Sequence, residues 1–398
     1  MDKTADVIVV GAGVVGCSVA YYLAREGARV TLVEKEAIGS GASAHATGSL
    51  SLLGTEFSPG PSFQLALAGY REFPDLVNWL EEETGMDLLF QRRPSLRLAL
   101  DEEEAQLIKD LMPWQQRFVE MKWIGGDEVR RIEPRLTPQI IGAVYENESA
   151  QLDSYRLNLA LAQAAEKRGA AVQLREVTGL LTEPGRVLGV RTSSDDFLGD
   201  TVVVAAGTWS RAFGEWLNFP VPVRALKGER LMLRYQGNPL LVLISSPRRG
   251  HMISRLDGLL SVGSTGGRDY DRQELFWGEG FNRQPTEAAR VELLQRAIDV
   301  FPALLEDAEL VYHLAGSRPL SPDHWPIIGP APGWEGVMLA TAHTTKGIHL
   351  GPITGRIIAD YILKGATDVP IDMGSFLPGR FAGLVHADFY ASSQKVEE

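Results

Sequence analysis

The chain has 398 residues, 44% of them hydrophobic and 23% charged, which is typical of a globular protein large enough for two hydrophobic cores. Its formal net charge of −12 argues against nucleic acid or an anionic membrane surface as a partner. No apolar run approaches the roughly 18 residues of a membrane-spanning helix. We expect no signal peptide, because the first residues lead directly into a predicted strand. Cys17 is the single cysteine, which excludes internal disulfides and cysteine zinc sites. We expect a cytoplasmic protein without a metal.

The first predicted elements surround a glycine motif. An apolar strand at 6–10 leads directly into Gly-Ala-Gly-Val-Val-Gly at 11–16. A helix at 17–26 and a second strand at 29–33 follow, and Glu34 comes directly after that strand. The order of strand, glycines, helix, strand and acid is typical of a dinucleotide-binding fingerprint.

Each residue of the motif has a physical role. Gly11 allows a tight turn, Gly13 lets the backbone approach a pyrophosphate, and Gly16 lets the helix pack close to the strand. The pyrophosphate would bind at the helix N-terminus, where unpaired N–H groups and the positive end of the dipole face it. Glu34 would accept hydrogen bonds from a ribose and repel a 2′-phosphate, which favours FAD or NAD over NADP. Cys17 is expected to pack within the helix.

Periodicity predicts the remaining elements. After a small-residue loop at 39–49 they are, in chain order, a helix at 63–84, a strand at 95–100, a helix opening at 101–104, a helix at 155–168, strands at 171–174, 187–192, 201–205, 230–235, 251–255 and 259–263, a helix at 285–301, a strand at 336–341 and a helix at 351–363. The alternating strands between 223 and 267 predict an antiparallel second layer. Pro352 would lie near the first turn of the last helix. We predict an α/β protein, α+β overall, with a Rossmann-type domain and an interleaved antiparallel sheet.

Further motifs lie in the C-terminal third. Arg318 stands in a Gly-x-Arg-Pro sequence, Pro-Ile-Ile-Gly follows at 326–329, and a Thr-, His- and Gly-rich stretch spans 343–356. Together with the glycine motif and Ala-Ala-Gly at 205–207, they resemble the D-amino acid oxidase-like flavoproteins, in the branch of glycine oxidase and hydrogen cyanide synthase. The resemblance runs from Val7 to about Phe381 and includes the late Ile371-Asp372 and Arg380-Phe381.

The resemblance implies a glutathione reductase- or D-amino acid oxidase-like fold that binds FAD and not NAD. It further implies an FAD-binding domain at 1–85, 145–220 and 316–385, a substrate domain at 86–144 and 221–315, and a polar tail at 386–398. The residues implied to contact FAD are Gly11, Gly13, Val14, Val15, Gly16, Glu34, Lys35, Ser40, Ser43, His45, Ala46, Thr47, Val177, Ala206, Gly207, Trp209, Arg318, Gly347, Ile348 and His349.

The implied reaction is hydride transfer from the amine-bearing carbon of an amino acid to flavin N5, after which the imine hydrolyses. The substrate would be a small or N-alkylated amino acid, such as glycine, sarcosine, a proline-like compound or a D-amino acid. In the family an arginine at the Arg318 position binds the carboxylate, because its planar fork can bind it bidentately. The alternative is that Arg318 pins the Pro319 loop through a surface ion pair.

Three rim residues depart from the family pattern and are candidate catalytic residues beside Arg318. His251 stands where glycine oxidases usually have a tyrosine, and its charge would vary near neutral pH. Lys346 follows Thr345, where many glycine oxidases have an arginine, and His349 stands where the sarcosine oxidase branch often has a lysine. We therefore expect a substrate other than simple glycine. The alternative is that one or two of these side chains face solvent.

His45 raises the question of a covalent flavin. It lies in a small-residue loop resembling that of the dimethylglycine dehydrogenases, in which a histidine bonds to the flavin, although the preceding tryptophan is missing here. Non-covalent packing of His45 against the cofactor is the alternative. Asp153 and Asp323 are expected to cap backbone N–H groups and not to act as bases.

Electrons could pass to oxygen, or to a partner protein if the chain is the catalytic subunit of a multi-subunit amino acid or opine dehydrogenase. A homo- or hetero-oligomer is possible in either case. A nucleotide-binding protein without chemistry is the remote alternative.

Overall fold

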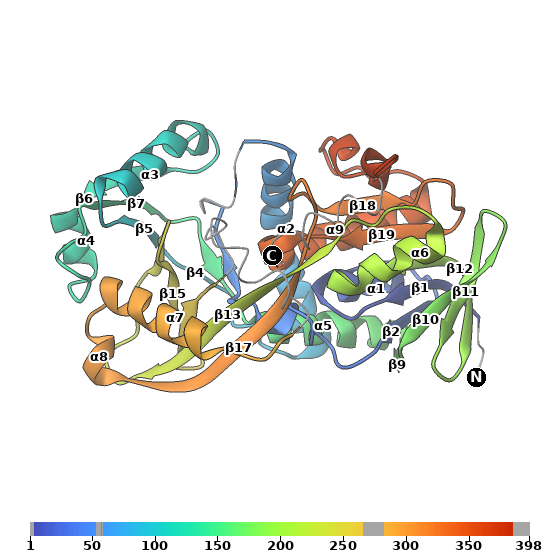
Figure 1. Ribbon diagram of the computed structural model, residues 1–398, viewed down its shortest axis with the longest axis horizontal. Helices are drawn as coiled ribbons and strands as arrows, with labels where there is room; N and C mark the ends of the chain where they lie inside the picture. The colour runs from blue at the N-terminus through green and yellow to red at the C-terminus, as the bar shows by residue number, and fades with distance from the viewer. Residues whose placement is uncertain (1–3, 53–56, 58, 266–281, 385–398) are drawn as a thin grey trace, which may run out of the picture.

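The computed structural model describes residues 4–52, 57, 59–265 and 282–384. The predicted polar tail at 386–398 lies outside the described residues. Two main sheets lie at opposite ends of an elongated molecule. The sheet that contains the strand before the glycine motif is at the right of Figure 1, and the antiparallel sheet is at the left. Among the described residues, every helix is too short or too polar to cross a membrane.

The first sheet has a parallel centre. Its main path runs β10 (Val177–Glu183), β11 (Arg186–Thr192), β12 (Asp196–Val204), β1 (Thr4–Val10), β2 (Val30–Glu34) and β9 (Ala171–Leu174). β19 (Val337–Thr341) also pairs with β12 in parallel, and β18 (Ile327–Pro330) pairs with β19. Because β1, β2, β9, β12 and β19 are parallel to their neighbours in this centre, their carboxyl ends meet at one edge, where ligands bind in open α/β sheets.

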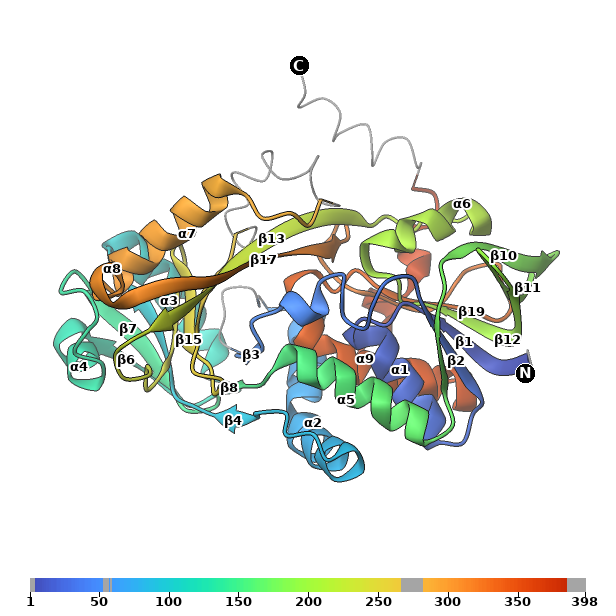
Figure 2. The ribbon, with the colours of Figure 1, turned by 90° about the horizontal axis from the view of Figure 1, so that it is seen from below.

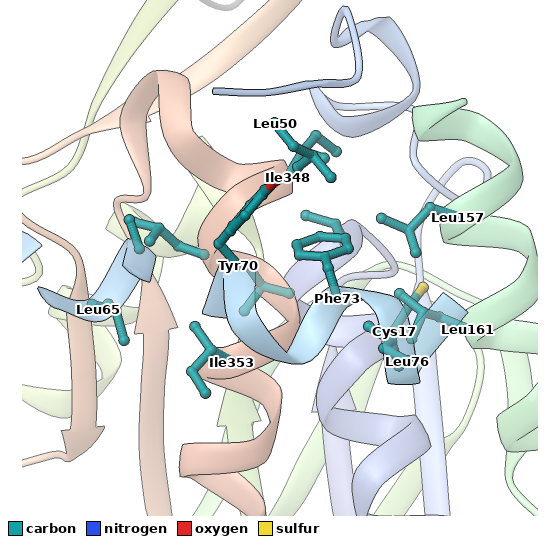
Figure 3. Close-up of a cluster of buried hydrophobic side chains, with 14 of the residues drawn as sticks. Cys17, Leu50, Leu65, Tyr70, Phe73, Leu76, Leu157, Leu161, Ile348 and Ile353 are labelled. Atoms are coloured by element: carbon teal, nitrogen blue, oxygen red, sulfur yellow. The ribbon is translucent and has the colours of Figure 1, made fainter. Parts of the chain in front are cut away.

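Three helices pack beside this sheet: α1 (Val14–Arg25), α5 (Ser154–Lys167) and α9 (Gly347–Lys364). A fourth helix, α2 (Pro61–Thr84), packs against α5 and α9 (Figure 2). Figure 3 shows Phe73 and Leu76 of α2 beside Leu157 and Leu161 of α5, within one buried apolar cluster. Cys17 of α1 belongs to the same cluster, which confirms its packing role.

Two helices begin earlier than the periodicity predicts. α1 begins at Val14 and not at 17, so the last glycine of the motif lies inside the helix. α9 begins at Gly347 and not at 351, so Pro352 lies within the helix and cannot donate to the carbonyl four residues earlier. α9 lies close to α1: an added Cβ at Gly355 would lie 2.5 Å from Ser18 Cβ.

The second sheet carries a long two-stranded arm. Its order is β17 (Ala308–Leu320), β13 (Arg224–Tyr235), β16 (Leu260–Gly263), β15 (Gly250–Ser254), β14 (Leu243–Ser246), β5 (Ser95–Ala99), β7 (Gly142–Glu146) and β6 (Met121–Gly125). These pairs are antiparallel except β14 with β5. β13 and β17 run from this sheet toward the nucleotide-binding part (Figure 1). The predicted combination of a Rossmann-type domain and an antiparallel sheet is therefore confirmed.

The remaining elements are short or lie at the surface. They are β3 (Ser49–Leu50), β4 (Gln91–Arg92) and β8 (Ala150–Gln151), which form a small sheet, and α3 (Glu102–Gln115), α4 (Gly126–Ile132), α6 (Phe213–Leu217), α7 (Glu287–Val300) and α8 (Leu304–Asp307). Short 3-10 turns span Ser43–His45, Gly207–Ala212, Thr344–Lys346, Met373–Ser375 and Pro378–Phe381. β7 and β17 extend across the predicted domain limits at 145 and 316, so those limits remain a prediction.

Candidate active site

The glycine motif forms a tight backbone cradle at the end of β1. Gly11 has φ +102°, and a Cβ there would lie 2.5 Å from the Ala205 carbonyl oxygen. A Cβ on Gly16 would lie 1.8 Å from the Gly11 carbonyl oxygen. Both positions therefore require glycine, because a side chain would push α1 away from the strand ends. Gly13, Val14 and Val15 at the start of α1 line a cavity, and a helix N-terminus favours the binding of a ligand's phosphates.

Glu34 is fixed beside this cradle. One carboxylate oxygen accepts the Ala12 N–H at 2.8 Å and the other accepts the Glu36 N–H at 2.9 Å. The side chain is 9% exposed and lines the cavity described next. Carboxylate oxygens can accept more than one hydrogen bond each, so Glu34 retains acceptor capacity for ribose hydroxyls.

One cavity of about 600 Å³ joins the cradle to the second sheet. All the residues predicted to contact FAD line this cavity except Gly16, which packs against the backbone of Gly11. The others are Gly11, Gly13, Val14, Val15, Glu34, Lys35, Ser40, Ser43, His45, Ala46, Thr47, Val177, Ala206, Gly207, Trp209, Arg318, Gly347, Ile348 and His349. The Lys35 ammonium lies 4.1 Å from the centre of the Trp209 ring, so Trp209 packs against the nucleotide-binding part. A crowded glycine cradle, a buried acid and one long cavity fit FAD.

Arg318 lies at the far end of the cavity, on β17. Its Nη1 donates to the Thr265 carbonyl at 3.0 Å and its Nη2 donates to Ser264 Oγ at 3.0 Å. The guanidinium lies over Gly228 of β13, where an added Cβ would be 2.2 Å from Arg318 Cζ. Gly228 therefore provides the space in which this guanidinium faces the cavity.

His251 lies on β15 and also lines the cavity. Its Nε2 and Thr47 Oγ1 are 2.7 Å apart, with donor and acceptor set by the tautomer. Burial, followed by the positive charges of Arg230 and Arg318, lowers the pKa of His251 to about 3. The expectation that its charge varies near neutral pH is therefore wrong, because the imidazole stays neutral there.

His349 lies in the first turn of α9 and is 9% exposed. Burial, with a smaller contribution from Lys346, lowers its pKa to about 4. Its Nδ1 is buried without a hydrogen-bond partner among the described residues, and the residue lines the cavity. His45 also lines the cavity, and burial is the main cause of its lowered pKa. The question of a covalent link to His45 remains open.

Three other residues are placed away from the cavity wall. Lys346 is not among the lining residues, and its ammonium lies 4.9 Å from the centre of the Phe57 ring. Asp153 caps α5 by accepting the Arg156 N–H at 2.9 Å, and Asp323 accepts the Trp325 N–H at 3.1 Å. The two aspartates therefore have the predicted capping roles. Lys346 is not placed as a substrate contact, because its side chain lies over the Phe57 ring, although Thr344 and Thr345 of the same turn line the cavity.

The sequence prediction missed two buried arginines at the substrate end. Arg230 of β13 is 5% exposed, Arg97 of β5 is 7% exposed, and both line the cavity. The available signal was a charged residue inside a strand that is otherwise apolar, as in Ser-Leu-Arg-Leu-Ala at 95–99. In the described part of the chain, no group of His, Cys, Asp and Glu side chains could hold a metal ion.

Known proteins are similar to this chain in sequence and in fold. The family model described as FAD dependent oxidoreductase matches residues 6–361. Glycine oxidase of Pseudomonas aeruginosa is 33% identical over 379 residues, which cover 94% of this chain and 98% of that protein. The hydrogen cyanide synthase protein HcnC of the same species is 28% identical over 420 residues, covering 96% and 97%. A crystal structure of glycine oxidase from Geobacillus kaustophilus, 30% identical, has a TM-score of 0.86 and covers 94% of this chain and 98% of its own. The chain therefore belongs to the family of FAD-dependent oxidoreductases, and FAD is its cofactor.

Proposed function

We propose that this enzyme is an oxidase of a small or N-alkylated amino acid. The observation that carries the proposal is the position of Arg318, whose guanidinium faces the same cavity as the glycine cradle. The similarity to glycine oxidases over nearly the whole chain supports the same class of substrate. An amine held by its carboxylate at Arg318 would lie at the far end of the cavity from the nucleotide cradle.

The residues have distinct parts in this proposal. Bound FAD supplies the two-electron acceptor for a hydride from the amine-bearing carbon. Arg318 would bind the substrate carboxylate through its planar fork, with its orientation held by Thr265 and Ser264. His251 and His349, neutral at pH 7, would add polar contacts without repelling a cationic amine as it enters.

The electron acceptor separates two candidate functions. Oxygen is the proposed acceptor, as the name of the glycine oxidase relatives suggests for those proteins. The similarity to HcnC favours the alternative of a catalytic subunit that passes electrons to a partner protein. Hydrogen peroxide formation by the purified chain under air would support the oxidase. A flavin that is reduced by an amine and stays reduced under air would support the alternative.

The experiment that tests the substrate class is anaerobic bleaching of the flavin by N-methyl, cyclic and D-amino acids. Arg318→Ala should lose bleaching by carboxylated amines while it retains FAD, and Arg318→Lys should recover part of it. Unchanged substrate affinity in Arg318→Ala would refute the proposed carboxylate site. Denaturation of the purified protein would show whether the colour stays with the polypeptide, as a bond to His45 requires. A colourless protein would favour a nucleotide-binding role without chemistry.

The cytoplasmic location and the oligomeric state are also proposals from the sequence. Cell fractionation and the mass of the native protein in solution would test them.

A further inference from the structure

A polar row crosses the second sheet at the substrate end of the cavity. Register pairs place Arg230 of β13 beside Gly263 of β16, Gly263 beside His251 of β15, His251 beside Ser245 of β14, and Ser245 beside Arg97 of β5. Directly paired residues share one face of a sheet, so these side chains all project to the same side. The four residues of the row that have side chains line the cavity.

The neighbouring row shows that this face is distinct. The residues next to the polar row in each strand pair across the sheet in the same order. They are Leu231, Val262, Met252, Ile244 and Leu96. All five belong to one buried apolar cluster with α7. The sheet therefore presents an apolar face to its own core and a face with two arginines to the cavity. The arginines do not contribute to packing of that core.

Arg230 is buried without a carboxylate partner among the described residues. Its Nη1 donates to Ser261 Oγ at 3.1 Å, while its Nε is buried without a hydrogen-bond partner. Among the ion pairs between described residues, none includes Arg230. The nearby Asp153 and Asp257 both pair with Arg255. Glu229, its neighbour in the strand, pairs with Lys227 at 3.3 Å and with His313 at 2.9 Å.

The buried guanidinium of Arg230 destabilises the folded protein unless an anion binds beside it. Burial lowers the pKa of Arg230 to about 10, which leaves it charged at neutral pH. A buried cation that lacks a counter-charge keeps much of its desolvation penalty. Arg97 adds a second positive charge at the other end of the row. The polar row thus has two positively charged residues that line the cavity in addition to Arg318.

We propose that Arg230 forms a second anion site, and that the preferred substrate is an amine with two carboxylates. The proposal rests on the proposed amino acid oxidase function. Arg318 would bind the carboxylate next to the amine-bearing carbon, and Arg230 would bind a second carboxylate across neutral His251. The second carboxylate could belong to the side chain, as in aspartate and glutamate, or to the N-substituent, as in N-(carboxymethyl)glycine.

The first test uses the wild-type holoenzyme and compares substrates of similar size. N-(carboxymethyl)glycine is compared with N-ethylglycine, and D- and L-aspartate with D- and L-2-aminobutyrate. We expect kcat/KM to be roughly 10- to 100-fold higher for the dicarboxylate in one of these sets, because a charge-assisted hydrogen bond is gained. The better set identifies whether the second carboxylate is on the side chain or on nitrogen. Equal kcat/KM within both sets would overturn the proposal.

The second test changes the residue. Arg230→Met retains much of the side-chain length and should reduce the ratio of dicarboxylate to monocarboxylate kcat/KM by a similar factor. Arg234→Met is the matched control, since Arg234 lies on the same strand, is exposed, pairs with Glu309 at 2.7 Å and does not line the cavity. An unchanged ratio in Arg230→Met, or loss of FAD as its main effect, would overturn the proposal.

The two proposals fail differently. If monocarboxylic amines bleach the flavin and dicarboxylic amines have no advantage, the second anion site is wrong and the amino acid oxidase proposal stands. If no amine bleaches the flavin, the proposed function is wrong and the second site falls with it.

Discussion

Substitution of Gly228 by alanine tests whether the position of Arg318 sets substrate affinity. Gly228 does not contact the substrate in our proposal, yet a Cβ there would lie 2.2 Å from Arg318 Cζ and 2.3 Å from its Nη2. The backbone of Gly228 is within the paired region of β13 and β17, and it has no positive φ that alanine would resist. The guanidinium must therefore move, because the backbone at Gly228 is held by its pairing with β17, whereas the arginine side chain is flexible.

The magnitude follows from the contacts that this movement breaks. Arg318 donates to Thr265 and Ser264 in its present position, and a displaced guanidinium cannot keep both contacts and face the carboxylate. Loss of one charge-assisted hydrogen bond to the carboxylate costs about 1.5–3 kcal/mol, which corresponds to roughly a 10- to 150-fold lower kcat/KM. The cost to stability should be small, since the added methyl meets the end of a flexible side chain.

The assay is a double-mutant cycle on kcat/KM for the best amino acid substrate. Gly228→Ala alone should reduce kcat/KM, and it should have almost no effect in an Arg318→Ala background, because its target is then absent. The FAD content and the melting temperature verify that both variants fold. If Gly228→Ala reduces kcat/KM as strongly in the Arg318→Ala background, the effect does not pass through Arg318 and the reasoning is refuted.

Gly16→Ala should prevent FAD binding, because its methyl would lie 1.8 Å from the Gly11 carbonyl oxygen. The control Gly125→Ala should retain FAD, because its methyl meets no atom within 4 Å. The ratio of flavin to protein absorbance measures the FAD content of both variants. Lys346→Met should change the substrate KM by less than about twofold, since Lys346 does not line the cavity. A tenfold rise in KM would contradict this and indicate that Lys346 contacts the substrate. Acidification should destabilise the fold, because burial holds the pKa values of His251, His343 and His349 well below the ordinary 6.5. As the pH falls below 6.5, the unfolded chain binds protons that the folded chain does not. The free energy of unfolding should therefore decrease, by about 2 kcal/mol per histidine at pH 5. Urea unfolding at pH 7 and 5 measures this, and equal midpoints would contradict it.

The nucleotide cradle could be predicted from the sequence because its determinants are local. The strand, the glycines, the helix and Glu34 fall within 34 residues, and each has a backbone conformation or a charge that the ligand requires. Family resemblance then supplied the other residues expected to contact FAD, including Val177, which lies far from the motif in the chain and lines the cavity.

The substrate end could be predicted only in part, because it depends on alignment across distant strands. Arg97, Arg230 and His251 lie on three different strands, and their common face follows from strand register. β17 contains Gly316 and Pro319, residues that weaken a strand pattern, although proline is tolerated at a sheet edge such as this one. Lys346 was placed at the rim from the family's sequence pattern, which gives its position in the chain but not the direction of its side chain, and that side chain lies over the Phe57 ring.

The two faces of the second sheet separate stability from substrate choice. In the strands of the polar row, the neighbours Leu231, Met252, Ile244 and Leu96 carry the packing of the core. Substitutions of Arg230, His251, Ser245 or Arg97 change groups on the opposite face, which makes no contribution to that cluster. Removal of a buried charge also relieves its desolvation cost. The fold should therefore tolerate changes along the polar row that alter the substrate. The glycine cradle tolerates little, because a side chain there would meet backbone, whereas a change at Gly228 should reduce substrate binding far more than stability.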